Sequence, residues 1–176
     1  MKTVSIFIVV LVFVSAFAFA HENHTAAPGD AEIAHIVVTA NAIDIDAGKM
    51  AVKKAKNNEV KDFAQMMITD HSGVNQQASS LAKKLSVVPK ENHISSSLLK
   101  DAKGVMGKLK KLSGQEFDKE YMNREVAYHE AVLAAIDKTL IPNAKNAELK
   151  GLIEKVRPAI AAHLEHAKHI QASLLK

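Results

Sequence analysis

The sequence contains no cysteine among its 176 residues. It therefore has neither a disulfide framework nor a cysteine for a lipid anchor, and an exported form must rely on its packed core alone. Aromatic residues make up only 5% of the chain, and basic residues are mixed with acidic ones except for a dense group at Lys108, Lys110 and Lys111. With no recognition motif beside that group, we expect no nucleic-acid partner.

The chain also lacks the patterns that mark common enzymes. It shows no nucleophile paired with a base, no glycine-rich phosphate loop, and no motif of the known hydrolases or kinases. We assign no catalytic residue, and the sequence favours a protein that is not an enzyme. Alternation of apolar and polar residues with a period of two, which would indicate strands, is absent as well.

Residues 1–20 form the one long apolar run, MKTVSIFIVVLVFVSAFAFA. Lys2 precedes the run, and Ala18-Phe19-Ala20 supplies the small-x-small pattern of a cleavage site, so we predict a signal peptide cut after Ala20. The location expected is periplasmic or secreted. Because no second apolar run follows, we expect no stable membrane insertion after cleavage. A protein partner fits this interpretation as well, and neither its identity nor the oligomeric state follows from the pattern.

The polar stretch 21–29 is predicted to be a flexible leader, and residues 30–176 a single domain. Apolar residues with four-and-three spacing predict a helix that begins at an Asp30 N-cap, a second that runs from the Asn57-Asn58 turn to about Ser86, and a weaker crossing helix at 92–112. A fourth helix should begin at Ser113 with a capping box and close near Pro142. The last is expected to kink or restart near Val156, before Pro158. The fold class is all-α: a ferritin-like up-down four-helix bundle with a short additional crossing helix.

Several positions on the inward stripes of these helices are ionisable instead of apolar. His71 lies in the middle of the second helix, and distance from the Asn57-Asn58 turn places Asp44 at the same height, both roughly 20 Å along their helices. The same argument for the last two helices places Glu125, His129 and His163 in one layer. Asp70 and His166 lie at the edges of their stripes.

Imidazole and carboxylate groups that face each other inside a bundle are how such proteins bind transition metals. The candidate metal residues are therefore Asp44, Asp70, His71, Glu125, His129, His163 and His166. The candidate ions are iron, zinc, manganese and copper, and no other cofactor is indicated. The alternative is a metal-free polar layer that fixes helix register in a structural or partner-binding module of the cell envelope. Beside ionised carboxylates and without metal, the histidine pKa values are expected to rise.

The string NAIDIDAGKMAVKKAKNNEVKDFAQMMITDH, followed by FDKEY, His129, Pro158 and His163, resembles the exported bacterial family called domain of unknown function 4142. The resemblance runs from about Asp30 to Leu175. At Asp44 this chain has the shorter acid where the family pattern commonly has Glu. The resemblance implies a ferritin-like bundle and an exported protein, and it implies no established activity. We therefore expect an exported bundle with a role in metal handling or envelope stress, or the metal-free module above.

Overall fold

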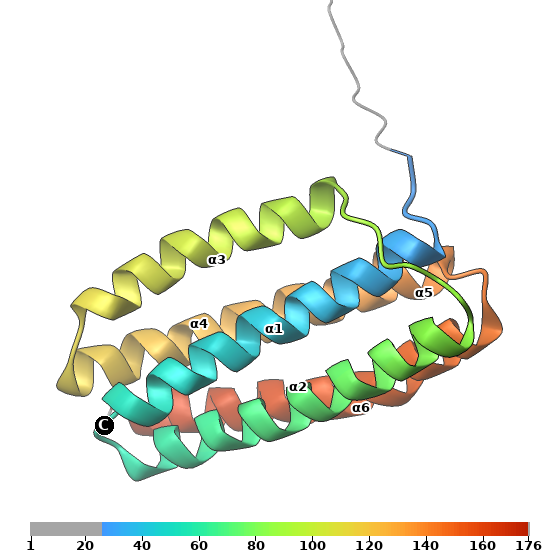
Figure 1. The fold of residues 1–176 in the computed structure, drawn as a ribbon. Coiled ribbons are helices and arrows are strands. Elements are labelled where there is room, and N and C mark those ends of the chain that lie inside the picture. The colour runs from blue at the N-terminus through green and yellow to red at the C-terminus, as the bar shows by residue number, and fades with distance from the viewer. Residues whose placement is uncertain (1–25, 176) are drawn as a thin grey trace, which may run out of the picture.

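The computed structural model describes residues 26–175, and Figure 1 shows them as a bundle of helices. The long helices are α1 (Asp30–Lys54), α2 (Asn58–Lys84), α3 (His93–Lys111), α4 (Gly114–Ala135) and α6 (Ala147–Ser173). A π-helical turn, η1 (Ile136–Leu140), and the short α5 (Ile141–Asn143) extend α4. No strand occurs within residues 26–175. The predicted signal peptide and residues 21–25 of the leader lie outside the described residues.

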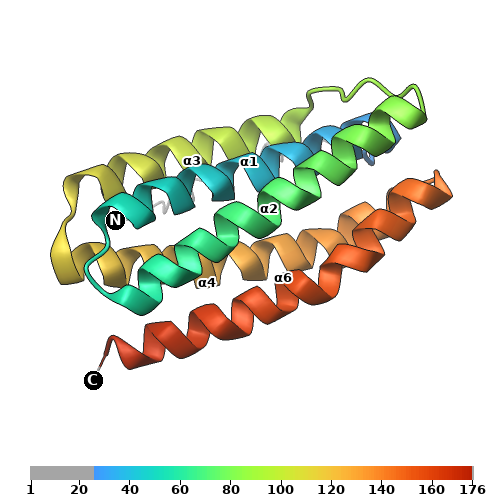
Figure 2. The same cartoon turned by 60° about the horizontal axis from the view of Figure 1, so that its bottom comes forward.

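The four-helix bundle consists of two antiparallel hairpins, α1 with α2 and α4 with α6 (Figures 1 and 2). α3 runs back along the outside of α1 and joins the two hairpins, so that α4 begins at the same end of the bundle as α2. This long crossover is one of the two standard ways to connect such a bundle. The predicted all-α bundle with an additional crossing helix is confirmed. At 19 residues, the crossing helix is the shortest of the five long ones.

Three helix features differ from the prediction. α4 has Ser113 as its N-cap, but the Ser113 side chain makes no capping hydrogen bond, so the predicted capping box is absent. The N-cap of α1 is Gly29, one residue before the predicted Asp30. Asp30 instead accepts hydrogen bonds from the backbone N–H groups of Lys145 (2.8 Å) and Asn146 (3.1 Å), which ties the start of α1 to the start of α6. α6 also continues through Pro158 without a restart. Pro158 has no backbone N–H for the carbonyl oxygen of Glu154, but both residues are exposed, so water can donate to that oxygen instead.

The apolar core is divided in two along the bundle axis. One cluster, around Phe63, Met67 and Tyr121, fills the end with the α1–α2 turn. The other, around Ile33 and Ile153, fills the opposite end. Five buried ionisable residues lie between these clusters, so apolar side chains shield this polar layer from water on both sides: Asp44, His71, Glu125, His129 and His163. Asp118, also buried, instead accepts hydrogen bonds from Lys56 and Asn57 at the α1–α2 turn.

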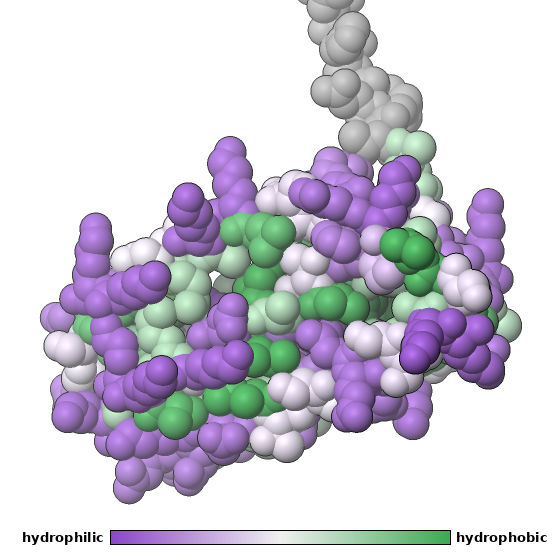
Figure 3. All heavy atoms as spheres, in the orientation of Figure 1, coloured by the Kyte–Doolittle hydropathy of each residue, from purple (hydrophilic) through white to green (hydrophobic). Residues whose placement is uncertain are grey.

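On the face of the molecule seen in Figure 3, hydrophobic residues form separate patches among hydrophilic ones. None of the helices within residues 26–175 combines the length and hydrophobicity that a bilayer crossing requires. The buried polar layer is therefore the feature of the described chain that most needs a functional explanation.

Candidate metal centre

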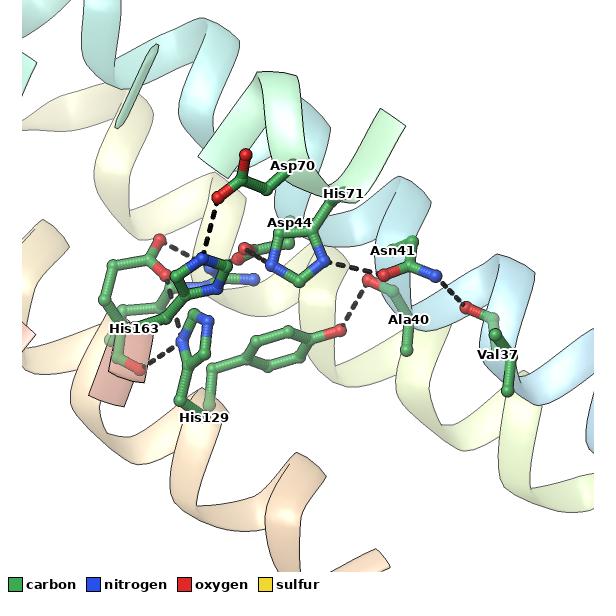
Figure 4. A network of polar contacts seen from close by, with 11 residues as sticks. Val37, Ala40, Asn41, Asp44, Asp70, His71, His129 and His163 are labelled. Atoms are coloured by element: carbon green, nitrogen blue, oxygen red, sulfur yellow. Dashed lines mark hydrogen bonds and ion pairs between the residues drawn. The ribbon is translucent and has the colours of Figure 1, made fainter. Parts of the chain in front are cut away.

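The polar layer receives side chains from all four bundle helices (Figure 4). Its members share near-complete burial, with at most 5% of any one residue exposed: Asp44 from α1, His71 from α2, Glu125 and His129 from α4, and His163 from α6. The structure thus brings together five of the seven residues that the sequence indicates. Within each hairpin, these residues lie at similar distances from the turn. Because both antiparallel helices have the same rise per residue, the side chains come to the same height.

The three histidines form a nearly equilateral triangle. Their ring centroids are 5.8 Å apart between His71 and His129, 5.5 Å between His71 and His163, and 5.6 Å between His129 and His163. One ring nitrogen from each histidine lies within 4.8 Å of the corresponding nitrogen of the other two. Three imidazoles from three different helices therefore face a common point.

Each of these imidazoles has one ring nitrogen that faces a hydrogen-bond acceptor. His71 Nδ1 lies 2.6 Å from Asn41 Oδ1, His129 Nδ1 lies 3.0 Å from the backbone oxygen of Glu125, and His163 Nε2 lies 2.9 Å from Asp70 Oδ2. The Asn41 amide is oriented by its own bond from Nδ2 to the Val37 backbone oxygen, at 2.9 Å. Because all three partners are acceptors, the facing nitrogens carry the protons of the neutral rings.

The remaining nitrogens are then unprotonated and carry lone pairs. His71 Nε2, His129 Nε2 and His163 Nδ1 are buried, and none has a hydrogen-bond partner within the described part of the chain. His71 Nε2 also faces an acceptor, Asp44 Oδ2, at 3.0 Å: a protonated His71 forms an ion pair with Asp44, whereas a neutral ring with its proton on Nδ1 leaves both atoms with lone pairs. Buried polar atoms normally have partners. Three imidazole nitrogens within 4.8 Å of one another, with the Asp44 carboxylate beside His71, fit a cation.

Two of the seven predicted residues lie outside this cluster. Asp70 is on the outer side of His163, with 45% of its side chain exposed, and acts on the cluster only through its bond to that ring. His166 is exposed on α6, and its ring meets the edge of Phe63 with 5.4 Å between centroids. The structure therefore leaves His166 without a place among the ligand atoms.

Arg124 is a member of the layer that the stripe pattern did not indicate. Its Nη1 donates to Asp44 Oδ1 and, at 2.6 Å, to Glu125 Oε1, and only 7% of its side chain is exposed. Its guanidinium carbon lies 4.1 Å from the centroid of the Tyr128 ring. The one feature of the sequence that could have indicated Arg124 is its position directly before Glu125, at the edge of the same inward stripe. Asn41, three residues before Asp44, also lies at the edge of its stripe, and the spacing of apolar residues did not indicate it either.

Burial and charge together set the ionisation of the layer. Burial opposes the charge on Asp44, but the Arg124 guanidinium outweighs that effect and holds the pKa of Asp44 well below its usual value. Burial raises the pKa of Glu125 to about 8, although Arg124 acts in the opposite direction. Burial lowers the pKa of His129 to about 4 and also lowers the pKa of His163. The expectation of raised histidine pKa values is therefore wrong for these two, because desolvation exceeds the attraction of the carboxylates.

The donor set is chemically selective. Neutral imidazoles suit zinc, copper, iron and nickel, whereas magnesium and calcium prefer all-oxygen sites. A low pKa helps such a site, because protons compete less with a metal for a histidine that is already neutral. The hydrogen bond from His163 to Asp70 is the type of outer contact that orients metal-binding histidines in general. The residues present thus fit a transition-metal ion.

Comparison with known proteins supports the family and the fold. The sequence profile described as "Domain of unknown function (DUF4142)" matches residues 16–170. A solved structure described as "CopM in the Cu(II)-bound form" is similar, with a TM-score of 0.64 and 15% sequence identity. The match covers 84% of this chain and 99% of that one, and at this identity it shows a shared fold. No curated protein matches the sequence.

Proposed function

The chain belongs to the DUF4142 family, and on that premise we propose that it is an exported helical bundle that binds one transition-metal ion. The ligands are His71, His129 and His163, with Asp44 next to them as a fourth donor. The export rests on the signal sequence in residues 1–20, which implies a periplasmic or secreted location. The role that follows is metal handling in the cell envelope.

One observation carries the proposal: three buried imidazoles bring one nitrogen each within 4.8 Å of one another, and the only group near their inner nitrogens within residues 26–175 is the Asp44 carboxylate, 3.0 Å from His71 Nε2. A lone buried histidine needs one partner and usually finds it in the core. Here one nitrogen of each ring faces an acceptor outside the triangle, and this contact orients the other nitrogen toward the inside of the triangle. Leaving three such nitrogens dry and unpaired is costly, and a bound cation removes that cost.

Copper and zinc are the ions that this donor set suits best. Both accept imidazole ligands, and the chain offers no thiolate that would favour a softer ion. The similar fold of CopM was solved with Cu(II) bound, which makes copper the first ion to test. Iron and manganese are weaker candidates, because Arg124 already holds one oxygen of each of the two carboxylates that they would use.

Electron paramagnetic resonance of the protein loaded with one equivalent of Cu²⁺ tests the ligand set. We expect nitrogen hyperfine coupling from three imidazoles, and each of His71→Ala, His129→Ala and His163→Ala should remove one coupled nitrogen. His169→Ala is the matched control, because His169 is exposed on the same helix as His163. A spectrum without imidazole coupling would exclude the proposed site.

The alternative is a metal-free polar layer, and Arg124 is the observation that favours it. Its guanidinium partly neutralises two buried carboxylates with no need for a metal. In that case the histidines specify helix register in a structural or partner-binding module. Denaturant melts with and without a chelator separate the two functions, since only a metal protein loses stability when chelated.

A further inference from the structure

A second group of possible metal ligands overlaps the histidine triangle. One oxygen each of Asp44 and Glu125 and one nitrogen of His129 lie within 4.8 Å of one another, and all three residues are buried. Each carboxylate also has one buried oxygen without a hydrogen-bond partner among residues 26–175, Asp44 Oδ2 and Glu125 Oε2, and the Asp44 oxygen is the one beside His71. Two carboxylates in hydrogen-bonding range of a single cation form the kind of oxygen-rich site that hard divalent ions use.

The cation that lies between these carboxylates is a side chain. Arg124 Nη1 contacts one oxygen of Asp44 and one of Glu125 at the same time. The guanidinium is held there by burial and by the Tyr128 ring, whose hydroxyl is in turn fixed by a 2.8 Å hydrogen bond to the Ala40 backbone oxygen. Arg124 is thus a buried part of the core, and it supplies to this carboxylate pair the positive charge that a bound ion would otherwise supply.

Charge balance explains why the position must be filled. Asp44 and Glu125 are both fully buried, and two carboxylates in a dry core cannot stay ionised without a cation nearby. One guanidinium supplies a single positive charge. Removing it would leave the pair to bind either a proton or a metal ion. His129 has one free lone pair and can serve one ion at a time, so a second ion would depend on the carboxylates.

We propose that Arg124 replaces a second metal ion in this bundle: it occupies the Asp44–Glu125 carboxylate pair and thereby limits the protein to the single ion held by the histidines. The inference rests on the proposed function for that first ion. It also assigns a latent second site, for a hard divalent cation such as Mn²⁺, that opens when the guanidinium is removed.

Arg124→Met tests the inference, because methionine fills similar space without charge. Both proteins are first loaded with one equivalent of Zn²⁺ at the histidines and then titrated with Mn²⁺, with free Mn²⁺ followed by electron paramagnetic resonance. We expect the variant to bind one equivalent of Mn²⁺ and the wild type none. Arg124→Met/Glu125→Gln should lose the Mn²⁺ again, and Arg124→Lys, which keeps a cation there, should not gain it.

The outcomes distinguish this inference from the proposed function. Wild type that binds no Zn²⁺ would overturn the proposed function. Wild type that binds Zn²⁺ and also Mn²⁺, or a folded Arg124→Met that binds Zn²⁺ alone, would overturn only the role of Arg124. If the variant is unfolded without metal, circular dichroism during Mn²⁺ addition decides: folding on addition supports the second site, and a chain that stays unfolded contradicts it.

Discussion

His163 donates the hydrogen of its Nε2 to Asp70 across the interface between α6 and α2, with 2.9 Å between the two atoms. The bond leaves Nδ1 of the same ring free and directs it toward His71 and His129. Asp70 itself is half exposed and contributes little to the core. The role of Asp70 is therefore to fix the orientation and the tautomer of the His163 imidazole.

The first prediction concerns Asp70→Ala. Because the His163 ring loses its orienting acceptor, the metal affinity should fall about 10- to 100-fold, while the unfolding midpoint of the metal-free protein changes little. Calorimetric titration with Cu²⁺ or Zn²⁺ measures the change. Asp62→Ala, at an exposed acid on the same helix, should retain wild-type affinity. Equal affinities in both variants would show that Asp70 does not support the site.

The second prediction is a loss of stability of the metal-free protein at alkaline pH. The pKa of Glu125 is raised to about 8 in the folded protein, from an ordinary value of 4.5. The folded state therefore holds a proton that the unfolded state has released, and the stability from that proton is lost as pH rises through 8. His129 acts in the opposite direction, but only below its ordinary pKa of 6.5.

Between pH 6.5 and 8 the effect of Glu125 is thus unopposed by His129. The free energy of unfolding should fall by up to about 2 kcal/mol across this window, the limit set by one proton. Urea melts in the presence of a chelator measure it. Glu125→Gln carries no titratable proton, so its unfolding free energy should be flat over the same range. A wild type that gains stability from pH 6.5 to 8 would refute the assignment of a raised pKa to Glu125.

The third prediction concerns the close approach of α1 and α2. A methyl group added at Gly48 would lie 2.9 Å from the backbone oxygen of Ala64 and 3.0 Å from Ile68 Cγ1. Gly48→Ala should therefore destabilise the protein by about 1 to 3 kcal/mol, because backbone atoms must shift.

Gly73→Ala is the matched control for Gly48→Ala. Gly73 is inside α2 and has open space around its Cα, so alanine there should stabilise the helix by about 0.5 to 1 kcal/mol. Thermal melts of the two variants give the comparison. If Gly48→Ala were as stable as Gly73→Ala, the helices would not be in the close contact described.

The sequence predicts the layer well because helix geometry is regular. Four-and-three spacing identifies the inward face of each helix, and a rise of about 1.5 Å per residue converts distance from a turn into height. Asp44 and His71 meet for that reason. The same arithmetic aligns Glu125, His129 and His163, since the second hairpin closes at Pro142 and Asn143 as expected.

Residues at the edge of a stripe escape this reasoning. Arg124 and His166 both border an inward face, and a small rotation of the helix decides whether such a side chain enters the core. Arg124 turns inward because two buried carboxylates attract it. His166 stays exposed, and its ring packs against that of the buried Phe63 on the neighbouring helix, with 5.4 Å between centroids. Both outcomes depend on neighbouring helices, so no pattern within one helix could predict them.

The most direct test of the account is a calorimetric titration of tag-free mature protein with Cu²⁺ and Zn²⁺. We predict one ion per chain, with affinity lowered more than about 100-fold in His71→Ala, His129→Ala or His163→Ala, a larger loss than for an outer contact. His169→Ala should bind normally, and so should His21→Ala/His24→Ala, which removes histidines outside residues 26–175. A dissociation constant weaker than about 1 mM, or an affinity that falls with His21 and His24 instead of the buried triangle, would contradict the account.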